Sequence, residues 1–118
     1  MRKFVDYDLD SNLKNEIIKI KNMILKNLNN IEIYLFGSIA KGKYSKNSDI
    51  DILVLINENK TLKELRELRH LLEDNIDILH LSRSVDIKVY EKERYFNLSA
   101  RPSFEKEILK DLIDLKEW

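Results

Sequence analysis

The chain has 118 residues, with 21 basic side chains, 21 acidic side chains and no cysteine. This length predicts a single domain over residues 1–118. The balanced charge gives no overall field that would draw the protein to nucleic acid or to an anionic membrane. The absence of cysteine excludes disulfides, thiolate zinc sites and cysteine nucleophiles. No apolar run approaches membrane-spanning length, and the opening MRKFVDYDLD lacks the apolar core of a secretory signal, so we expect a soluble, cytoplasmic protein.

The first part of the chain predicts a helix, a strand and a glycine-containing loop. Apolar residues recur at helical spacing over residues 11–29. Residues 31–36, IEIYLF, are rich in β-branched and aromatic side chains and predict a short strand. The loop after this strand contains both glycines of the chain, Gly37 and Gly42, and we expect a helical turn in it near residues 39–41.

The rest of the chain continues the alternation of strands and helices. Residues 49–56, DIDILVLI, are apolar on both faces after their aspartates, which is typical of a central strand covered on both sides. Helical spacing predicts a helix over 61–81, and SVDIKVY predicts a strand over 84–90. We expect a helix over 91–98 and, after a break at the only proline, a last helix from Ser103 followed by a short tail. The fold class predicted is α/β, with a small mixed sheet of three or four strands flanked by helices.

Two aspartates stand at alternate positions at the start of the predicted central strand. Asp49 and Asp51 project to the same face, about 6.6 Å apart along the chain. Asp86 lies in the strand 84–90, and its carboxylate reaches the same place if the two strands are neighbours. Mg²⁺ relieves repulsion among such carboxylates, because it prefers oxygen ligands and shares its coordination shell with substrate phosphates. Two such ions about 3.5–4 Å apart suit an in-line phosphoryl displacement.

Asp77, in the segment NIDILHL, is the alternative third carboxylate. We prefer Asp86, because Asp77 falls on the polar side of the predicted helix and SVDIKVY is the better strand sequence. The two histidines, His70 and His80, lack the i, i+4 spacing of a zinc pair, so they are not expected to bind a metal ion.

The loop after the first strand is the candidate nucleotide-binding segment. A strand that runs into Gly37-Ser38 exposes backbone N–H groups and, with a short helix behind it, forms a concavity suited to phosphates. Ser38 adds a hydroxyl donor. Lys41 and Lys43 are placed to neutralise a triphosphate, and Ser48, at the end of the loop, completes the expected set of nucleotide-binding residues.

The order of these motifs resembles that of the minimal nucleotidyltransferases of the DNA polymerase β superfamily. The resemblance rests on Gly37-Ser38, a ten-residue gap, the pair Asp49 and Asp51, and the later strand aspartate Asp86. It implies a palm-like nucleotidyltransferase domain in which Asp49 and Asp51 bind two Mg²⁺ ions, Asp86 completes the metal site or acts as a base, and Gly37 and Ser38 hold ATP. One departure is a lysine at position 41, where relatives often carry arginine; it keeps the charge and loses the bidentate fork.

The resemblance also implies a reaction and a class of partner. It implies Mg²⁺-dependent transfer of AMP from ATP to a hydroxyl, with a tyrosine of a helical HEPN toxin as the leading acceptor, which would make the chain the MNT-type antitoxin of a HEPN/MNT pair. A small molecule such as an aminoglycoside is an alternative acceptor. A non-catalytic module that neutralises its partner by contact alone is another alternative, although a pure binder has no physical need for three mutually repelling carboxylates. Self-association stays open.

Overall fold

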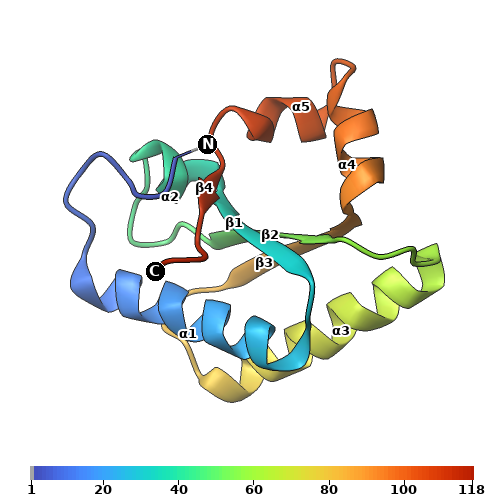
Figure 1. Ribbon diagram of the computed structural model, residues 1–118. Helices are drawn as coiled ribbons and strands as arrows, with labels where there is room; N and C mark the ends of the chain where they lie inside the picture. Colours follow the sequence, from blue (N-terminus) through green and yellow to red (C-terminus); the bar gives the residue numbers. More distant parts are fainter. Residues whose placement is uncertain (1) are drawn as a thin grey trace.

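A mixed four-stranded sheet forms the centre of the computed structural model, which describes residues 2–118 (Figure 1). The strands lie in the order β3-β2-β1-β4. Strand β2 pairs in parallel with β3 and antiparallel with β1, and β1 pairs antiparallel with β4. This confirms the predicted mixed sheet and the internal position of the apolar strand. The strands are β1 (Ile31–Phe36), β2 (Ile50–Ile56), β3 (Val85–Glu91) and β4 (Ile113–Asp114).

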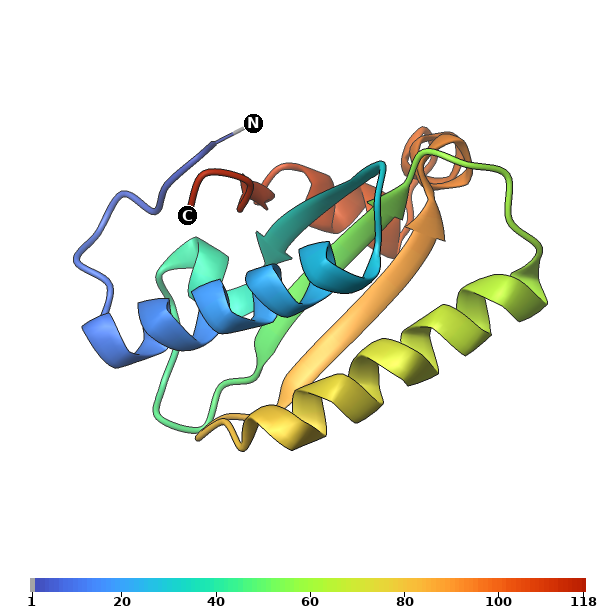
Figure 2. The ribbon, with the colours of Figure 1, turned by 60° about the horizontal axis from the view of Figure 1, so that its bottom comes forward.

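Helices cover both faces of this sheet. Helices α1 and α3 lie on one face, and α4 and α5 lie on the other (Figures 1 and 2). No helix within residues 2–118 combines the length and the apolar composition needed to cross a membrane. The helices are α1 (Ser11–Asn27), α2 (Gly37–Lys41), α3 (Leu62–Leu79), α4 (Lys92–Ser99) and α5 (Phe104–Leu109).

Side-chain caps set the starts of three helices. The Asp10 carboxylate accepts a hydrogen bond from the Leu13 N–H at the start of α1, and Ser103 caps α5. Thr61 forms a capping box with Glu64 at the start of α3, which satisfies two backbone N–H groups that would otherwise lack partners. Strands β1 to β3 and helices α1, α3 and α4 agree with the predicted ranges to within two residues, while α2 begins at Gly37, earlier than the expected turn.

Strand β4 is the element that the sequence did not predict. The tail after α5 turns back and pairs with β1 at two positions, Asp114 opposite Tyr34 and Ile113 opposite Leu35. Arg2 also bridges to Ile113, so residues from both ends of the chain meet at this edge. Two residues are too few to show the alternation that identifies a strand, which is why a tail was expected here.

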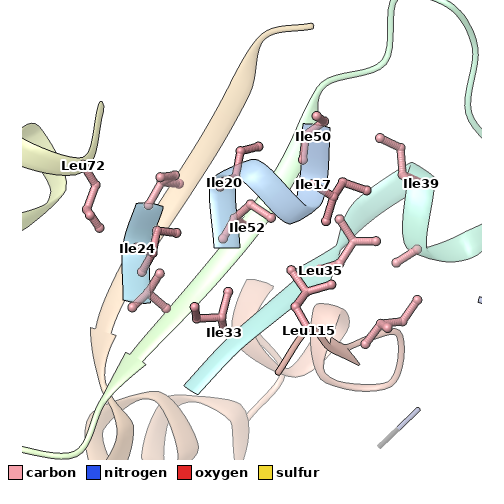
Figure 3. Close-up of a cluster of buried hydrophobic side chains, with 14 of the residues drawn as sticks. Ile17, Ile20, Ile24, Ile33, Leu35, Ile39, Ile50, Ile52, Leu72 and Leu115 are labelled. Atoms are coloured by element: carbon pink, nitrogen blue, oxygen red, sulfur yellow. The ribbon is translucent and has the colours of Figure 1, made fainter. Parts of the chain in front are cut away.

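The two faces of the sheet bury different side chains. On the α1 and α3 face, the cluster consists almost wholly of aliphatic residues, with Ile17, Ile20 and Ile24 of α1 facing Ile52 of β2 (Figure 3). We call this side the aliphatic face. On the α4 and α5 side, the cluster contains aromatic rings and consists of Tyr34, Phe36, Leu53, Leu55, Tyr95, Ile108 and Leu112. Because successive strand residues point to opposite faces, Asp51 shares this second side, which we call the carboxylate face.

Candidate active site

The structure brings Asp51 and Asp86 together. Asp51 is the second residue of β2, Asp86 is the second residue of β3, and the two are direct partners in the parallel register. Neighbouring strands lie about 4.8 Å apart, so both carboxylates project side by side from the carboxylate face. Asp49 lies just before β2 and is exposed. The sequence predicted that Asp86 would lie beside Asp51 if the two strands were neighbours, and the structure has them as neighbours. Asp49 lies next to this pair, on the exposed segment before β2.

Gly37 lies directly against the carboxylate of Asp51. It follows Phe36, the β1 partner of Asp51, and it has a φ of +77°. A Cβ atom added at Gly37 would lie 2.0 Å from Oδ2 of Asp51, closer than any real contact. The Asp51 carboxylate thus occupies the space that a side chain would need, and only glycine fits this junction. From the sequence, this glycine–serine turn was expected to bind phosphate; the contact with Asp51 is a second reason for a glycine here.

The charges around Asp51 leave it without direct compensation. Burial raises the pKa of Asp51, the negative charges of Asp86 and Asp49 add to this effect and Lys88 opposes it, and together they bring the pKa to about 6. The Lys88 ammonium lies 3.5 Å from the carboxylate of Asp86. No hydrogen bond or ion pair within residues 2–118 involves the side chain of Asp51. A half-buried carboxylate beside a second one, with one lysine paired to the second, favours binding of a cation.

The carboxylates present fit a hard divalent cation whose coordination shell is completed by oxygen atoms of the substrate. Within the described part of the chain, no group of three His, Cys, Asp or Glu side chains is arranged to hold a metal ion by itself. Mg²⁺ does not require such a group, because it is usually bound by one or two carboxylates together with water and substrate phosphates. Asp51 and Asp86 supply two carboxylates, and the Gly37 junction leaves backbone beside them. Oxygen donors of this kind suit Mg²⁺ better than they suit softer metals.

The lysines of the predicted nucleotide loop face another part of the surface. The Lys41 ammonium lies 3.7 Å from the Asp111 carboxylate, and Lys41 and Lys43 both line a cavity of about 410 Å³ together with Arg2 and Lys110. None of the ion pairs within residues 2–118 joins either lysine to Asp51 or Asp86. Their part in nucleotide binding therefore stays a prediction.

Arg83 is a residue of this region that the sequence reasoning missed. One of its guanidinium nitrogens donates to the carbonyl oxygens of Ser45, at 2.9 Å, and Ser48, at 2.8 Å. The guanidinium also lies 5.5 Å from the centre of the Tyr44 ring. Ser48 itself accepts a hydrogen bond from the Ser45 N–H, so its contacts belong to a turn of the loop. Arg83 thus fixes the loop that leads to Asp49; the available signal was its position just before β3, which lies beside β2.

Residues 70–80 take no part in the carboxylate pair. Asp77 belongs to α3 and is exposed, so Asp86 is the carboxylate that shares a strand pairing with Asp51, as the sequence favoured. The exposed His70 lies 3.4 Å from the Glu73 carboxylate, and His80 ends α3 with a φ of +51°.

A mixed sheet with paired strand carboxylates beside a glycine–serine junction is the arrangement that the resemblance to nucleotidyltransferase domains implied. The profile of the family described as "Nucleotidyltransferase domain" matches residues 17–115. The chain therefore belongs to this family.

Two curated proteins of Methanocaldococcus jannaschii are similar to the chain. The first, named "Putative protein adenylyltransferase MJ0141", is 39% identical in an alignment of 59 positions that covers 45% of this chain and 60% of that protein. The second, "Putative protein adenylyltransferase MJ0435", is 33% identical over 81 residues, which are 69% of this chain and 74% of that protein. The chain thus spans three fifths of the length of the first relative and about three quarters of the second.

Two solved structures also resemble it. A crystal structure described as a putative nucleotidyltransferase from Sulfolobus solfataricus aligns with a TM-score of 0.49 and 21% identity, covering 92% of this chain and 89% of that one. A crystal structure described as a toxin–antitoxin with AMP-PNP aligns with a TM-score of 0.42 and 28% identity, covering 75% of this chain and 68% of that one.

Proposed function

We propose that this protein transfers AMP from ATP to a hydroxyl group of a partner protein in a Mg²⁺-dependent reaction. The observation that carries the proposal is the in-register pair of Asp51 and Asp86, with Gly37 packed against the first of them. Family membership supports nucleotidyl transfer as the reaction. The names of the two curated relatives support a protein as the acceptor.

Each residue of the site has a defined task in this reaction. Asp51 and Asp86, with Asp49 at the entrance, would hold Mg²⁺ through their carboxylate oxygens. When bound, the cation neutralises the carboxylates and phosphates and stabilises the attacking and leaving oxygens. The backbone N–H groups at Gly37-Ser38 and the Ser38 hydroxyl would donate to the phosphates and orient the triphosphate. Lys41, Lys43 and Ser48 remain proposed as further contacts to the nucleotide.

The transfer needs a base for the acceptor proton. The acceptor oxygen attacks the α-phosphorus, the bond from that phosphorus to the bridging oxygen breaks, and pyrophosphate leaves with the electron pair. The hydroxyl proton goes to a carboxylate oxygen of Asp86, whose side chain is 43% exposed and therefore open to an incoming acceptor. The Lys88 ammonium lies 3.5 Å from this carboxylate.

A tyrosine of a helical HEPN partner is the acceptor that we propose. This choice follows from the resemblance to MNT-type antitoxins, and the exposed position of Asp86 suits a bulky acceptor better than an enclosed pocket would. An aminoglycoside-type acceptor would require an acidic pocket. The alternative of a non-catalytic antitoxin module predicts binding of the partner without transfer.

The test follows the label from the nucleotide into protein. The purified chain is incubated with Mg²⁺, a soluble extract of its source organism and ATP labelled with ³²P at either the α- or the γ-phosphate. We expect α-label in a protein band and no γ-label, with mass spectrometry locating AMP on a tyrosine. Transfer of γ-label would contradict the proposal, as would labelling that persists in EDTA.

Matched aspartate variants connect the label to the site. Asp51→Asn and Asp86→Asn should each lose about a hundredfold or more in transfer rate, because metal-assisted charge stabilisation is worth several kcal/mol. Asp77→Asn removes the same charge from exposed α3 and should stay within about threefold of the unmodified chain. Equal losses in all three variants would contradict the assignment of the site.

A further inference from the structure

Three arginines converge on a second cavity, at the opposite end of β3 from Asp86. The cavity has a volume of about 250 Å³ and is lined by Arg66 and Arg69 of α3, Arg94 of α4, and Val89 and Tyr90 of β3. Helices α3 and α4 lie on opposite faces of the sheet (Figure 1), and both contribute arginines to the lining of this cavity. Tyr90 is four residues beyond Asp86, which is about 13 Å along a strand.

The positive charge of this cavity is poorly compensated. No guanidinium of Arg66, Arg69 or Arg94 makes a hydrogen bond within residues 2–118. Arg69 has one acidic neighbour, Glu73, whose carboxylate is 3.9 Å from Nε, and that Nε is buried without a hydrogen-bond acceptor.

Two acids near the cavity, Glu91 and Glu105, accept hydrogen bonds from groups other than the arginines. Glu105 accepts a hydrogen bond from the Tyr90 hydroxyl at 2.7 Å, and Glu91 accepts one from the Lys60 N–H at 2.8 Å. Neither of these acids lines the cavity. Three arginines that line one cavity, with Glu73 as the one acidic partner among residues 2–118 and no hydrogen-bond acceptor there for their guanidiniums, favour an anionic ligand.

The edge of the sheet adds backbone donors at the same place. Strand β3 is the outermost strand on this side. The Ile50 N–H donates to the Ser84 carbonyl at 2.9 Å, which fixes the alternation of the parallel ladder. Even-numbered residues of β3 therefore bond to β2, and the N–H of Val89, a residue of the cavity lining, points away from β2. An anion there would meet guanidinium forks and a free backbone N–H together.

The size of the cavity limits the ligand. A volume of about 250 Å³ lies below the usual range of about 300–1,000 Å³ for sites that enclose a drug-sized ligand. It accommodates one compact anionic group. Arginine forks match the oxygens of phosphate in a bidentate manner, and a phosphate carries more charge than a carboxylate to balance three guanidiniums.

We propose that Arg66, Arg69 and Arg94 form a binding site for a phosphate group. The group is either free phosphate or the phosphate of a monoester. This site is distinct from the carboxylate pair, and the proposal does not depend on nucleotidyl transfer.

The test is a titration of the ¹⁵N-labelled chain at constant ionic strength, followed by amide chemical shifts. The probes are inorganic phosphate, O-phosphoserine and, as a carboxylate control, succinate. We expect both phosphate probes to shift the amides of Val89 and Tyr90 with saturation, and succinate to bind about tenfold more weakly or not at all. A stronger effect of phosphoserine would identify a monoester as the ligand, and a stronger effect of phosphate would identify the free anion; both support the site.

Charge-matched double variants separate the site from general attraction of anions. Arg66→Gln with Arg94→Gln should weaken phosphate binding by about tenfold or more, because hydrogen bonds between charged groups are lost. Lys19→Gln with Lys63→Gln removes the same charge from exposed positions outside the cavity and should change the affinity less than about twofold. Asp51→Asn should leave phosphate binding at Val89 intact even if it abolishes transfer. Equal weakening by both double variants, no shift at Val89, or equal binding of succinate would overturn the proposal.

Discussion

The two faces of the sheet differ in role: one is packed with aliphatic side chains, and the other carries the pair of carboxylates. The aliphatic face is closed by α1 and α3, the two longest helices, and Ile17, Ile20 and Ile24 of α1 are fully buried in it. The carboxylate face is covered by the short helices α4 and α5, and it carries Asp51 and Asp86 where β2 and β3 begin. Because side chains alternate along a strand, one set of alternate residues packs in the aliphatic face and the other set lies on the carboxylate face.

This division explains how β2 tolerates a carboxylate. Asp51 follows and precedes fully buried residues, Ile50 and Ile52, which belong to the aliphatic cluster. Burial of the Asp51 charge opposes folding, as its raised pKa indicates. The aliphatic face contributes the stability that holds the pair of carboxylates together. Mutations on the aliphatic face should therefore change mainly the stability, and mutations on the carboxylate face should change mainly nucleotide binding and pH dependence.

The largest effect on stability is expected on the aliphatic face. Ile20 has none of its side chain exposed. Ile20→Ala should lower the free energy of unfolding by about 2–5 kcal/mol, because it removes buried methyl groups and leaves a cavity. Urea unfolding followed by circular dichroism measures this loss, with Lys19→Ala as the exposed neighbour and an expected change within about 0.5 kcal/mol. A small loss for Ile20→Ala would break the comparison between the faces.

A smaller loss of stability is expected for substitutions at the two glycines. Comparing the two positions distinguishes backbone strain, which they share, from contact with Asp51, which only Gly37 makes. Gly37 and Gly42 have nearly the same positive φ, +77° and +76°. Alanine at either position should cost about 1–3 kcal/mol of stability, since left-handed backbone disfavours a side chain. At Gly37 the new Cβ displaces the Asp51 carboxylate, whereas at Gly42 its nearest neighbour is the ring of Tyr7, at 3.1 Å.

Binding of Mg²⁺ and ATP distinguishes the two variants. Calorimetric titration of Mg²⁺-ATP should show a loss of about tenfold or more for Gly37→Ala, by analogy with loss of a charged contact. Gly42→Ala should keep the affinity within about twofold of the unmodified chain. If both variants bind equally well, the position of Asp51 does not matter for the nucleotide.

Local patterns were sufficient to predict most of the fold. The helical periods of α1 and α3, and the apolar run of β2, are long enough to show their type and their burial. The pair Asp51 and Asp86 could also be predicted. Alternation within each strand indicates which face its aspartate lies on, and the assumption that β2 and β3 are neighbours places the two aspartates side by side. The two-residue strand β4 could not be predicted, because too few residues take part for a pattern to appear.

Contacts between distant segments were beyond the sequence. Arg83 bonds the turn at Ser45 and Ser48 across more than thirty positions, and a single arginine between two polar residues carries no periodic signal. The orientation of Lys41 toward Asp111 depends likewise on where the tail after α5 returns. The contact of Gly37 with Asp51 is similar, since the sequence indicated a phosphate beside this glycine and not an aspartate.

The smallest expected effect is a pH dependence that belongs to the carboxylate face alone. The pKa of Asp51 is raised from 3.8 to about 6, so between these values the folded chain binds a proton that the unfolded chain has lost. The stability that comes from this proton is present below pH 4 and is lost as the pH rises through 6. Because the carboxylate is about half exposed to water, we discount the full conversion of the shift and expect about 1 kcal/mol.

Asp51→Asn isolates this contribution. Other carboxyls have lowered pKa values, among them Glu32 through its contact with Lys92, and these groups add stability as the pH rises. The informative quantity is therefore the difference in unfolding free energy between Asp51→Asn and the unmodified chain, measured in urea at intervals from pH 4 to pH 8. The variant should gain about 1 kcal/mol relative to the unmodified chain over this range, with the gain concentrated between pH 4 and pH 6. Ile20→Ala, on the aliphatic face, should show a difference that does not change with pH. If the difference for Asp51→Asn also does not change with pH, the Asp51 carboxylate is well solvated. The two faces would then differ in packing alone.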